Sequence, residues 1–215
     1  MSPPLSRIPF LSLDGIDGTG KSTQCRLLAD WLRVRGYRVV SCADPGGTSL
    51  GNILRGLLLD HHQEMTLACE AFLFMASRAQ LVAEVIRPAL ESGQVVVADR
   101  FLLANVVYQG HAGGLDVGQL WDMGRLATGG LEPDLTLVLD LPLDVAQSRR
   151  GRHPDRLESR TEQYYRRVRE GFLREAQRRP ERIRVIDASP CIATVHERIC
   201  KEVRGMIQGG TVHSG

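Results

Sequence analysis

Eight residues near the start of the chain follow the spacing G-x-x-x-x-G-K-[ST], and this segment constrains the fold strongly. The segment is Gly15-Ile16-Asp17-Gly18-Thr19-Gly20-Lys21-Ser22. Glycines in such a segment let backbone N–H groups point inward and cradle phosphate groups. The lysine ammonium can then reach the β- and γ-phosphates of a nucleotide, and the serine hydroxyl can bind Mg²⁺. The spacing therefore predicts a phosphate-binding loop between a buried strand and the start of a helix.

Both flanks of the segment match that prediction. Residues 10–13 upstream are a short, mostly apolar run, which is typical of a buried strand. Downstream, apolar residues within 22–35 recur at nearly helical spacing, and Gly36 ends the helix. The start of that helix adds attraction for anions. The alternative is a glycine turn that binds nothing, but the motif and its context together favour the phosphate loop.

Lysine is rare among the basic residues of this chain, which makes the lysine of this loop more informative. The chain has 27 lysine and arginine residues, and only two of them are lysines, Lys21 and Lys201. An ammonium is a compact point charge, whereas a guanidinium is planar and extended. A lysine at this position in an arginine-rich chain therefore indicates a site that needs the compact cation.

Length and composition are those of one globular domain. The chain has 215 residues, of which 43% are hydrophobic and 24% charged, and its net charge is +2. This charge is too small to indicate a nucleic-acid or membrane partner, and no apolar run approaches the ~20 residues of a membrane span. Five cysteines without a C-x-x-C pair indicate reduced thiols in a cytoplasmic protein. We expect one domain over residues 9–207, with tails at 1–8 and 208–215.

Strand and helix candidates alternate along the chain. The strand candidates are mostly apolar runs, at residues 10–13, 38–42, 95–98, 135–141 and 183–186. Helix candidates lie at residues 22–35, 51–59, 66–91, 102–108, 116–128, 142–150, 158–178 and 192–207. This alternation predicts a three-layer α/β fold of the P-loop NTPase type, a five-stranded parallel sheet with helices on both faces. Ligands of such sheets lie beyond the carboxyl ends of the strands, which here carry Asp14, Asp44, Asp99 and Asp187.

The phosphate loop alone does not distinguish a GTPase, an ATPase and a small-molecule kinase. The chain has no N-K-x-D motif, which counts against a GTPase. Asp99 and Arg100 follow a buried strand, where the carboxylate can hold Mg²⁺ or its water and the arginine can bind a second phosphate. A surface ion pair is the alternative, but the carboxyl end of an apolar strand favours the functional interpretation.

A cluster of arginines predicts an Arg-rich lid over residues 148–158. Arg149, Arg150 and Arg152 fall within four residues and are interrupted by Gly151, so this segment cannot belong to the core. A solvated basic loop is the general alternative for a run of charges. Beside a phosphate loop, we instead expect a lid that brings cations to the transferred phosphoryl group.

A phenylalanine and an arginine form a third candidate group. Phe74 and Arg78 are four residues apart in a predicted helix and therefore share a face. Phe74 can stack on a base while Arg78 donates to a carbonyl oxygen. A core phenylalanine beside a surface arginine is the alternative.

Taken together, these motifs resemble the thymidylate kinases, the dTMP kinases of the phosphate-loop nucleoside monophosphate kinase group, over residues 10–207. The order and spacing of the matching segments are specific to that family, although no single segment is. The segments are Gly-Ile-Asp-Gly-Thr-Gly-Lys-Ser-Thr (15–23), Asp-Pro-Gly-Gly-Thr (44–48), Phe74 with Arg78, Asp-Arg-Phe (99–101), Tyr-Gln-Gly (108–110), Pro-Asp-Leu-Thr (133–136) and Asp-Arg-Leu-Glu (155–158).

The resemblance implies an activity, the Mg²⁺-dependent transfer of the ATP γ-phosphoryl group to dTMP in dTTP biosynthesis, giving ADP and dTDP. The cofactors would then be ATP, as phosphoryl donor, and Mg²⁺. A phosphate monoester is largely a dianion at neutral pH, so this acceptor needs no general base. The resemblance also implies a homodimer, built through helices such as the one that contains Phe72 and Phe74.

The resemblance further implies roles for individual residues. Phe74 would stack on thymine, Arg78 would donate to its O4, Asn105 would contact the base edge, and Tyr108 would lie near C2′ of the sugar. The residues that bind ATP would be Gly15, Ile16, Asp17, Gly18, Thr19, Gly20, Lys21, Ser22 and Thr23, with Ser22 and Asp99 at the metal. The catalytic residues would be Asp17, Lys21, Arg100, Arg149, Arg150 and Arg152. The acceptor would contact Asp17, Pro45, Phe74, Arg78, Arg100, Asn105, Tyr108, Gln109 and Tyr165.

Two departures from the family pattern leave alternatives open. Ala43 and Asp44 stand where the family commonly has Arg-Glu, so Arg55 could replace a missing arginine at the acceptor phosphate. Ala104 stands where a serine is usual. A kinase for another pyrimidine monophosphate or for a deoxynucleoside therefore stays open. A nucleotide-binding regulator without transfer activity is a further alternative, which the intact phosphate loop and lid arginines oppose.

Overall fold

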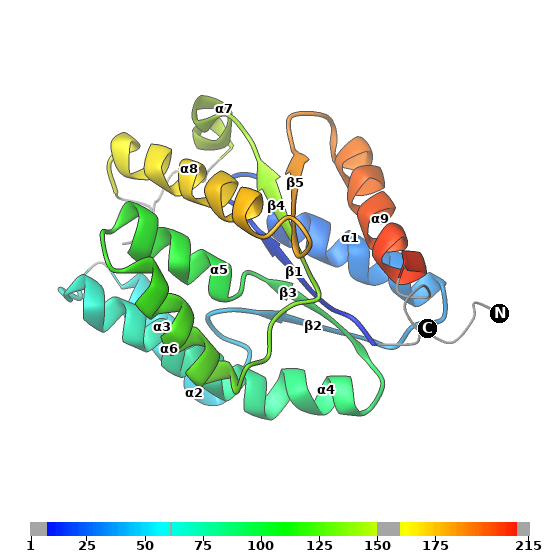
Figure 1. The fold of residues 1–215 in the computed structure, drawn as a ribbon, viewed down its shortest axis with the longest axis horizontal. Coiled ribbons are helices and arrows are strands. Elements are labelled where there is room, and N and C mark those ends of the chain that lie inside the picture. Colours follow the sequence, from blue (N-terminus) through cyan, green and yellow to red (C-terminus); the bar gives the residue numbers. More distant parts are fainter. Residues whose placement is uncertain (1–7, 61, 150–159, 210–215) are drawn as a thin grey trace.

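Five parallel strands form a sheet at the centre of the molecule (Figure 1). The computed structural model describes residues 8–60, 62–149 and 160–209. Within these ranges the strands run in the order β2-β3-β1-β4-β5, and every neighbouring pair is parallel. The prediction of a five-stranded parallel sheet is thus confirmed. The strands are β1 (Phe10–Asp14), β2 (Val39–Ala43), β3 (Val95–Asp99), β4 (Leu135–Asp140) and β5 (Ile183–Asp187).

Burial explains why the three inner strands read as continuous apolar runs. All residues of β1 are buried, as are all but the last residue of β3 and of β4. The two edge strands are less buried: β2 has no fully buried residue, and Val185 of β5 is 42% exposed. Strands covered on both faces need apolar side chains at every position, whereas edge strands do not.

Helices cover both faces of this sheet. Figure 1 shows α1 and α9 together on one side, and α3, α4, α5, α6 and α8 on the other. The predicted three-layer arrangement is therefore present. No helix in the described ranges is long and apolar enough to cross a membrane. The helices are α1 (Lys21–Val34), α2 (Ser49–Leu59), α3 (Leu67–Leu81), α4 (Arg87–Glu91), α5 (Leu102–Asn105), α6 (Val117–Thr128), α7 (Leu143–Ser148), α8 (Glu162–Arg178) and α9 (Ile192–Gly209).

Two of the predicted helices contain a wider, π-helical turn. The helix predicted at 66–91 runs as α3, then the π-helical segment η1 (Val82–Ile86), then α4. Pro88 has no N–H to donate four residues back, and the wide turn before it lets the chain continue without a break. The helix predicted at 102–108 likewise extends beyond α5 through η2 (Val106–Ala112).

The start of α8 differs from the prediction. This helix begins at Glu162, not at residue 158, and Thr161 is its N-cap. The Thr161 hydroxyl accepts a hydrogen bond from the backbone N–H of Tyr164, with an O–N distance of 3.2 Å. Most of the lid predicted at 148–158, namely residues 150–158, lies outside the described residues.

Gly124 of α6 lies where a larger residue would collide with α5. A Cβ added at Gly124 would be 2.2 Å from Cδ1 of Leu102, a side chain that is only 2% exposed. Alanine is favoured over glycine in an open helix by ~1 kcal/mol, but overpacking a core costs about 1–3 kcal/mol. We therefore expect Gly124→Ala to lower the free energy of unfolding by about 1 kcal/mol, measured by urea denaturation.

Gly205→Ala is the matched control for this prediction. Gly205 lies in α9, and a Cβ added there would have no atom within 4 Å. This variant should raise the free energy of unfolding by up to ~1 kcal/mol. Stabilisation by both substitutions would show that Leu102 moves aside without cost.

Candidate active site

The phosphate loop packs against its neighbours so closely that two of its positions exclude a side chain. A Cβ added at Gly15 would lie 2.5 Å from the carbonyl oxygen of Leu139, at the end of β4. At Gly18 the added Cβ would lie 2.2 Å from the carbonyl oxygen of Ala146 in α7. Both glycines also have positive φ angles, 132° and 89°. The glycines required by the motif therefore set the position of the loop as well as its shape.

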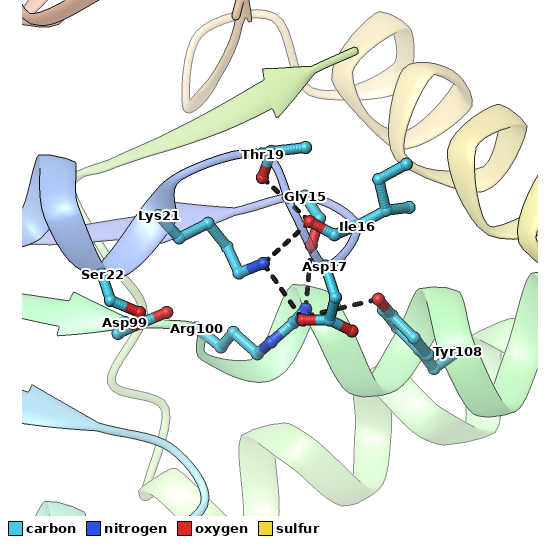
Figure 2. Close-up of polar contacts among 9 residues, drawn as sticks. All are labelled: Gly15, Ile16, Asp17, Thr19, Lys21, Ser22, Asp99, Arg100 and Tyr108. Carbon is cyan, nitrogen blue, oxygen red and sulfur yellow. Dashed lines mark hydrogen bonds and ion pairs between the residues drawn. The ribbon is translucent and has the colours of Figure 1, made fainter. Parts of the chain in front are cut away.

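The Lys21 ammonium folds back onto its own loop (Figure 2). Its Nζ donates to the Ile16 carbonyl at 2.9 Å and lies 3.4 Å from Oδ1 of Asp17. The Thr19 hydroxyl donates to the same carbonyl, also at 2.9 Å. Burial lowers the pKa of Lys21 and the charge of Arg100 lowers it further, whereas Asp17 opposes both effects. The loop thus holds a nearly buried cation where phosphate groups would bind.

Arg100 approaches the same loop from the end of β3. Its Nη1 donates to the Gly15 carbonyl at 3.0 Å, and its Nη2 donates to Oδ1 of Asp17 at 2.6 Å (Figure 2). The guanidinium carbon lies 5.2 Å from the centre of the Tyr108 ring. The φ angle of Arg100 is 69°, a conformation that costs a residue with a side chain about 1–3 kcal/mol. The strained residue is thus one whose guanidinium, like the Lys21 ammonium, lies next to Oδ1 of the Asp17 carboxylate.

A hydroxyl and a carboxylate lie where a metal ion would accompany phosphate groups. The Ser22 hydroxyl donates to Oδ2 of Asp99 at 2.6 Å (Figure 2). Asp14, at the end of the adjacent strand, is fully buried, and no hydrogen-bond partner for its carboxylate oxygens is present in the described residues. Burial raises the pKa of Asp14 to about 7. Mg²⁺ takes one or two carboxylates together with phosphates and water, and these residues fit that requirement.

A cleft of about 650 Å³ opens beside the phosphate loop. Loop and α1 residues 17–24 line it, together with Asp99, Arg100 and part of the segment 188–195 beyond β5. Arg149 also lines this cleft, and its Nη1 donates to the Ala188 carbonyl at 3.4 Å. Of the three predicted lid arginines, Arg149 is thus at the cleft, while Arg150 and Arg152 lie outside the described residues.

A second pocket, of about 110 Å³, adjoins this cleft. The two share four charged residues, Asp17, Asp44, Arg55 and Arg100. The rest of the second pocket is lined by Pro45, Leu59, Phe74, Arg78, Ala104, Asn105, Tyr108 and Gln109. All residues predicted to contact an acceptor therefore meet here, with the exception of Tyr165.

Tyr165 packs in the core instead. It is 1% exposed, and its ring centre lies 5.9 Å from that of Tyr164. Tyr164 donates its hydroxyl to the Tyr108 carbonyl at 2.7 Å. Both rings belong to the hydrophobic core, and neither tyrosine is among the residues that line the pocket, so the contact of Tyr165 with an acceptor stays a prediction.

Arg78 lies at the second pocket, and its guanidinium forms hydrogen bonds to other protein groups. Its Nε donates to Oδ2 of Asp44 at 2.5 Å, and the two side chains are 1% and 0% exposed. Its Nη1 donates to Oδ1 of Asn105 at 3.0 Å, whereas Nη2 makes only a 3.5 Å contact with the Phe101 carbonyl. Burial raises the pKa of Asp44, and Arg78 opposes that rise. The Nη2 end is therefore the part of Arg78 left for a ligand.

The sequence prediction assigned too small a role to two residues of the site, Arg55 and Asp14. Arg55 lines both clefts, and its Nη1 donates to the Pro45 carbonyl at 2.8 Å. The sequence signal that could have identified Arg55 is its position in the helix that follows the Asp-Pro-Gly-Gly-Thr segment. Asp14 was expected only at the sheet edge, because its burial beside Lys21 cannot be read from the strand pattern.

Comparison with known proteins agrees with this geometry. The thymidylate kinase family model matches residues 13–199. The chain is 50% identical over 190 residues to the thymidylate kinase of Rhodopirellula baltica, which covers 88% of this chain and 78% of the relative. It is 44% identical over 201 residues to that of Symbiobacterium thermophilum, covering 93% and 92% of the two chains.

A solved structure gives the same result. The crystal structure of thymidylate kinase from Ehrlichia chaffeensis matches with a TM-score of 0.77 at 30% identity. The match covers 92% of this chain and 99% of that one. Since the family model spans the phosphate loop, both clefts and four of the five strands, as well as the end of β1, this chain belongs to the thymidylate kinase family.

Proposed function

We propose that this protein transfers the γ-phosphoryl group of ATP to the 5′-phosphate of dTMP, giving ADP and dTDP. The observation that carries this proposal is the shared boundary of the two clefts, which is formed by charged residues. A donor in the larger cleft and an acceptor in the smaller pocket would meet at that boundary, as in-line transfer requires. Membership of the thymidylate kinase family supports ATP and dTMP as the two ligands.

The main difficulty of this reaction is bringing two polyanions together. Lys21 and Arg100 would leave the Asp17 carboxylate, bind phosphate oxygens and stabilise the negative charge spread over them in the transition state. Arg149 adds a third cation from the side of α7, and Arg150 and Arg152 are proposed to do the same from the lid. The acceptor is already a dianion, so transfer requires no side chain to remove a proton.

Ser22 and Asp99 would hold Mg²⁺ together with the phosphates of ATP. The bound ion supplies positive charge that offsets the developing charge on the phosphate oxygens. The hydrogen bond from Ser22 to Asp99 keeps both oxygen atoms close together before any ligand is present.

In the smaller pocket, Phe74 would stack on the base. Arg78 would donate to O4 of the base, and Asn105 would contact the base edge. Tyr108, 8% exposed, would pack against the sugar. Gln109 and Pro45 complete the walls. No feature of this pocket favours either alternative that the sequence left open, a kinase for a different monophosphate or a regulator without transfer activity.

We further propose a homodimer that forms through α2 and α3. Leu50, Ile53 and Leu57 lie on one face of α2 and are 46%, 61% and 41% exposed. Phe72, on the adjacent helix α3, is 60% exposed. A second copy of the chain would remove these apolar side chains from water. Alongside this assembly we propose one domain over residues 9–207 and a cytoplasmic location, with no nucleic-acid or membrane partner.

The activity is tested by measuring ADP formation with Mg-ATP and a panel of monophosphates: dTMP, dUMP, UMP, dCMP, CMP, dGMP and AMP. We expect dTMP to have the highest kcat/KM, because the pocket offers donors and acceptors to a 4-oxo pyrimidine, Tyr108 would pack at the sugar, and membership of the family favours thymine over uracil. A preference for another member would keep the kinase and change the acceptor. ATP binding without turnover of any member would contradict the proposed activity.

Arg55→Met should weaken use of dTMP more than use of ATP. The side chain lies at the boundary with the acceptor pocket, and a charged hydrogen bond to a phosphate is worth about 10- to 100-fold in affinity. We expect the KM for dTMP to rise by about that factor in steady-state kinetics. Arg33→Met, which removes an exposed arginine that pairs with Asp30 in α1, is the control. Unchanged dTMP kinetics in the Arg55 variant would remove this residue from the site.

The dimer is tested by light scattering coupled to size-exclusion chromatography. Wild-type protein should have twice the mass of the chain, and Ile53→Asp should reduce it to a monomer at micromolar concentration, because the interface would bury an unpaired charge. Val34→Asp places the same charge on α1 at a residue that is 85% exposed and should leave the dimer intact. A monomeric wild type, or a dimer in the Ile53 variant, would contradict this interface.

A further inference from the structure

Four hydrogen bonds between side chains connect the acceptor pocket to the start of α8. Arg78 Nη1 donates to Asn105 Oδ1 at 3.0 Å, and Asn105 Nδ2 donates to Gln109 Oε1 at 2.7 Å. Gln109 Nε2 donates to Glu70 Oε1 at 2.8 Å. The other oxygen of Glu70 accepts from Nη2 of Arg160 at 2.9 Å. We call these five residues the buried relay.

The charged members of the relay fix the orientation of the two amides between them. A carboxylate can only accept hydrogen bonds, and a guanidinium can only donate them. Glu70 therefore requires the NH₂ group of Gln109, which turns the Gln109 oxygen toward Asn105. Arg78 requires the oxygen of Asn105, which turns its NH₂ group toward Gln109. Reversing either amide would place two donors or two acceptors face to face.

The inner part of the relay is almost entirely buried, so few water molecules can replace a lost bond there. Arg78, Gln109 and Glu70 are each 1% exposed, and Asn105 is 2% exposed. An unmade hydrogen bond at such sites costs the full desolvation of the group. Arg78, Asn105 and Gln109 line the acceptor pocket, but Glu70 is not among the described residues that do. Glu70 therefore acts on an acceptor through Gln109.

The fixed orientation gives the pocket a definite hydrogen-bonding pattern. Arg78 presents donors, and Asn105 presents its Oδ1 as an acceptor beside them. A 4-oxo pyrimidine carries the complementary O4 acceptor and N3–H donor, whereas a 4-amino pyrimidine carries the reverse. We propose that Glu70 is a positioning residue that, through Gln109 and Asn105, makes the pocket prefer 4-oxo over 4-amino pyrimidine monophosphates. This role rests on the proposed function, in which the pocket binds a pyrimidine monophosphate.

Arg160 differs from the other members because it reaches water. Its side chain is 29% exposed, and its guanidinium carbon lies 5.0 Å from the centre of the Tyr164 ring. If Glu70 can no longer accept its hydrogen bond, Arg160 can turn toward solvent, whereas the buried Gln109 cannot. The hydrogen bonds of Glu70 to Gln109 and to Arg160 can therefore be separated by substitution.

The experiment compares Glu70→Met with Glu70→Gln, two side chains of nearly the same length and volume. The glutamine oxygen can still accept from Gln109 while its NH₂ group displaces Arg160 into water, so Glu70→Gln should retain most of the preference for dTMP. Methionine leaves Gln109 without an acceptor and releases both amides. For Glu70→Met we expect the KM for dTMP to rise about tenfold and the ratio of kcat/KM for dTMP over dCMP to fall about tenfold. The kcat with dTMP and the KM for ATP should stay within about twofold.

Glu84→Met removes an exposed glutamate of η1 and should change neither ratio nor KM. An unchanged dTMP-to-dCMP ratio in Glu70→Met would overturn the proposal, as would equal losses in the Met and Gln variants, because a packing or charge effect alone predicts that. If Glu70→Met does not fold, Gln109→Met removes the same bond from the donor side, and an unchanged ratio there is equally contradictory.

The same assay separates this inference from the function on which it rests. Wild-type protein that does not turn over dTMP would contradict the proposed activity. Wild-type protein that prefers dTMP, with a Glu70→Met variant that keeps that preference, would contradict the role of Glu70 alone.

Discussion

The arrangement of the whole site depends on the close packing of the phosphate loop against the sheet. Gly15 and Gly18 bring the loop backbone into contact with carbonyl groups of β4 and α7, at distances that no side chain would permit. Lys21 and Arg100 then use carbonyl groups of this same loop as hydrogen-bond acceptors. A shift of the loop would therefore displace both cations, so the geometry of phosphate binding is fixed by packing before a nucleotide is bound.

Around this loop the protein buries more charge than a stable fold requires. Asp14, Asp44, Lys21 and Arg78 are all at most 6% exposed. Moving an ionised group out of water costs several kcal/mol unless hydrogen bonds and an opposite charge offset the loss. The pKa of about 7 for Asp14 reflects that cost, since burial is its largest cause. Such groups gather where a charged ligand and a metal ion would complete their pairing, which is the general physical mark of an active site.

The sequence predicts those parts of the molecule that depend on local patterns. The spacing of Gly15 to Ser22 predicts the loop, and five apolar runs predict five parallel strands. The pairing of Arg78 with Asp44 could not be predicted, because it joins residues 34 positions apart and depends on how α2 and α3 pack, which no local pattern specifies. The burial of Tyr165 cannot be read from the sequence for a related reason: the rotation of α8 about its axis depends on what η2 presents to it.

The two arginines at the boundary of the two clefts, Arg55 and Arg100, attract any phosphate, and so they cannot by themselves select a nucleotide. Selection of the base has to come from groups whose hydrogen-bonding direction is fixed, because a free amide can rotate to match either a carbonyl or an amino group. Asn105 and Gln109 are such amides, and their direction is imposed from both sides by side chains that cannot reverse. One of these side chains, Arg78, lines the pocket. The other, Glu70, lies behind the pocket, where base selectivity can be altered without touching the groups that bind phosphate.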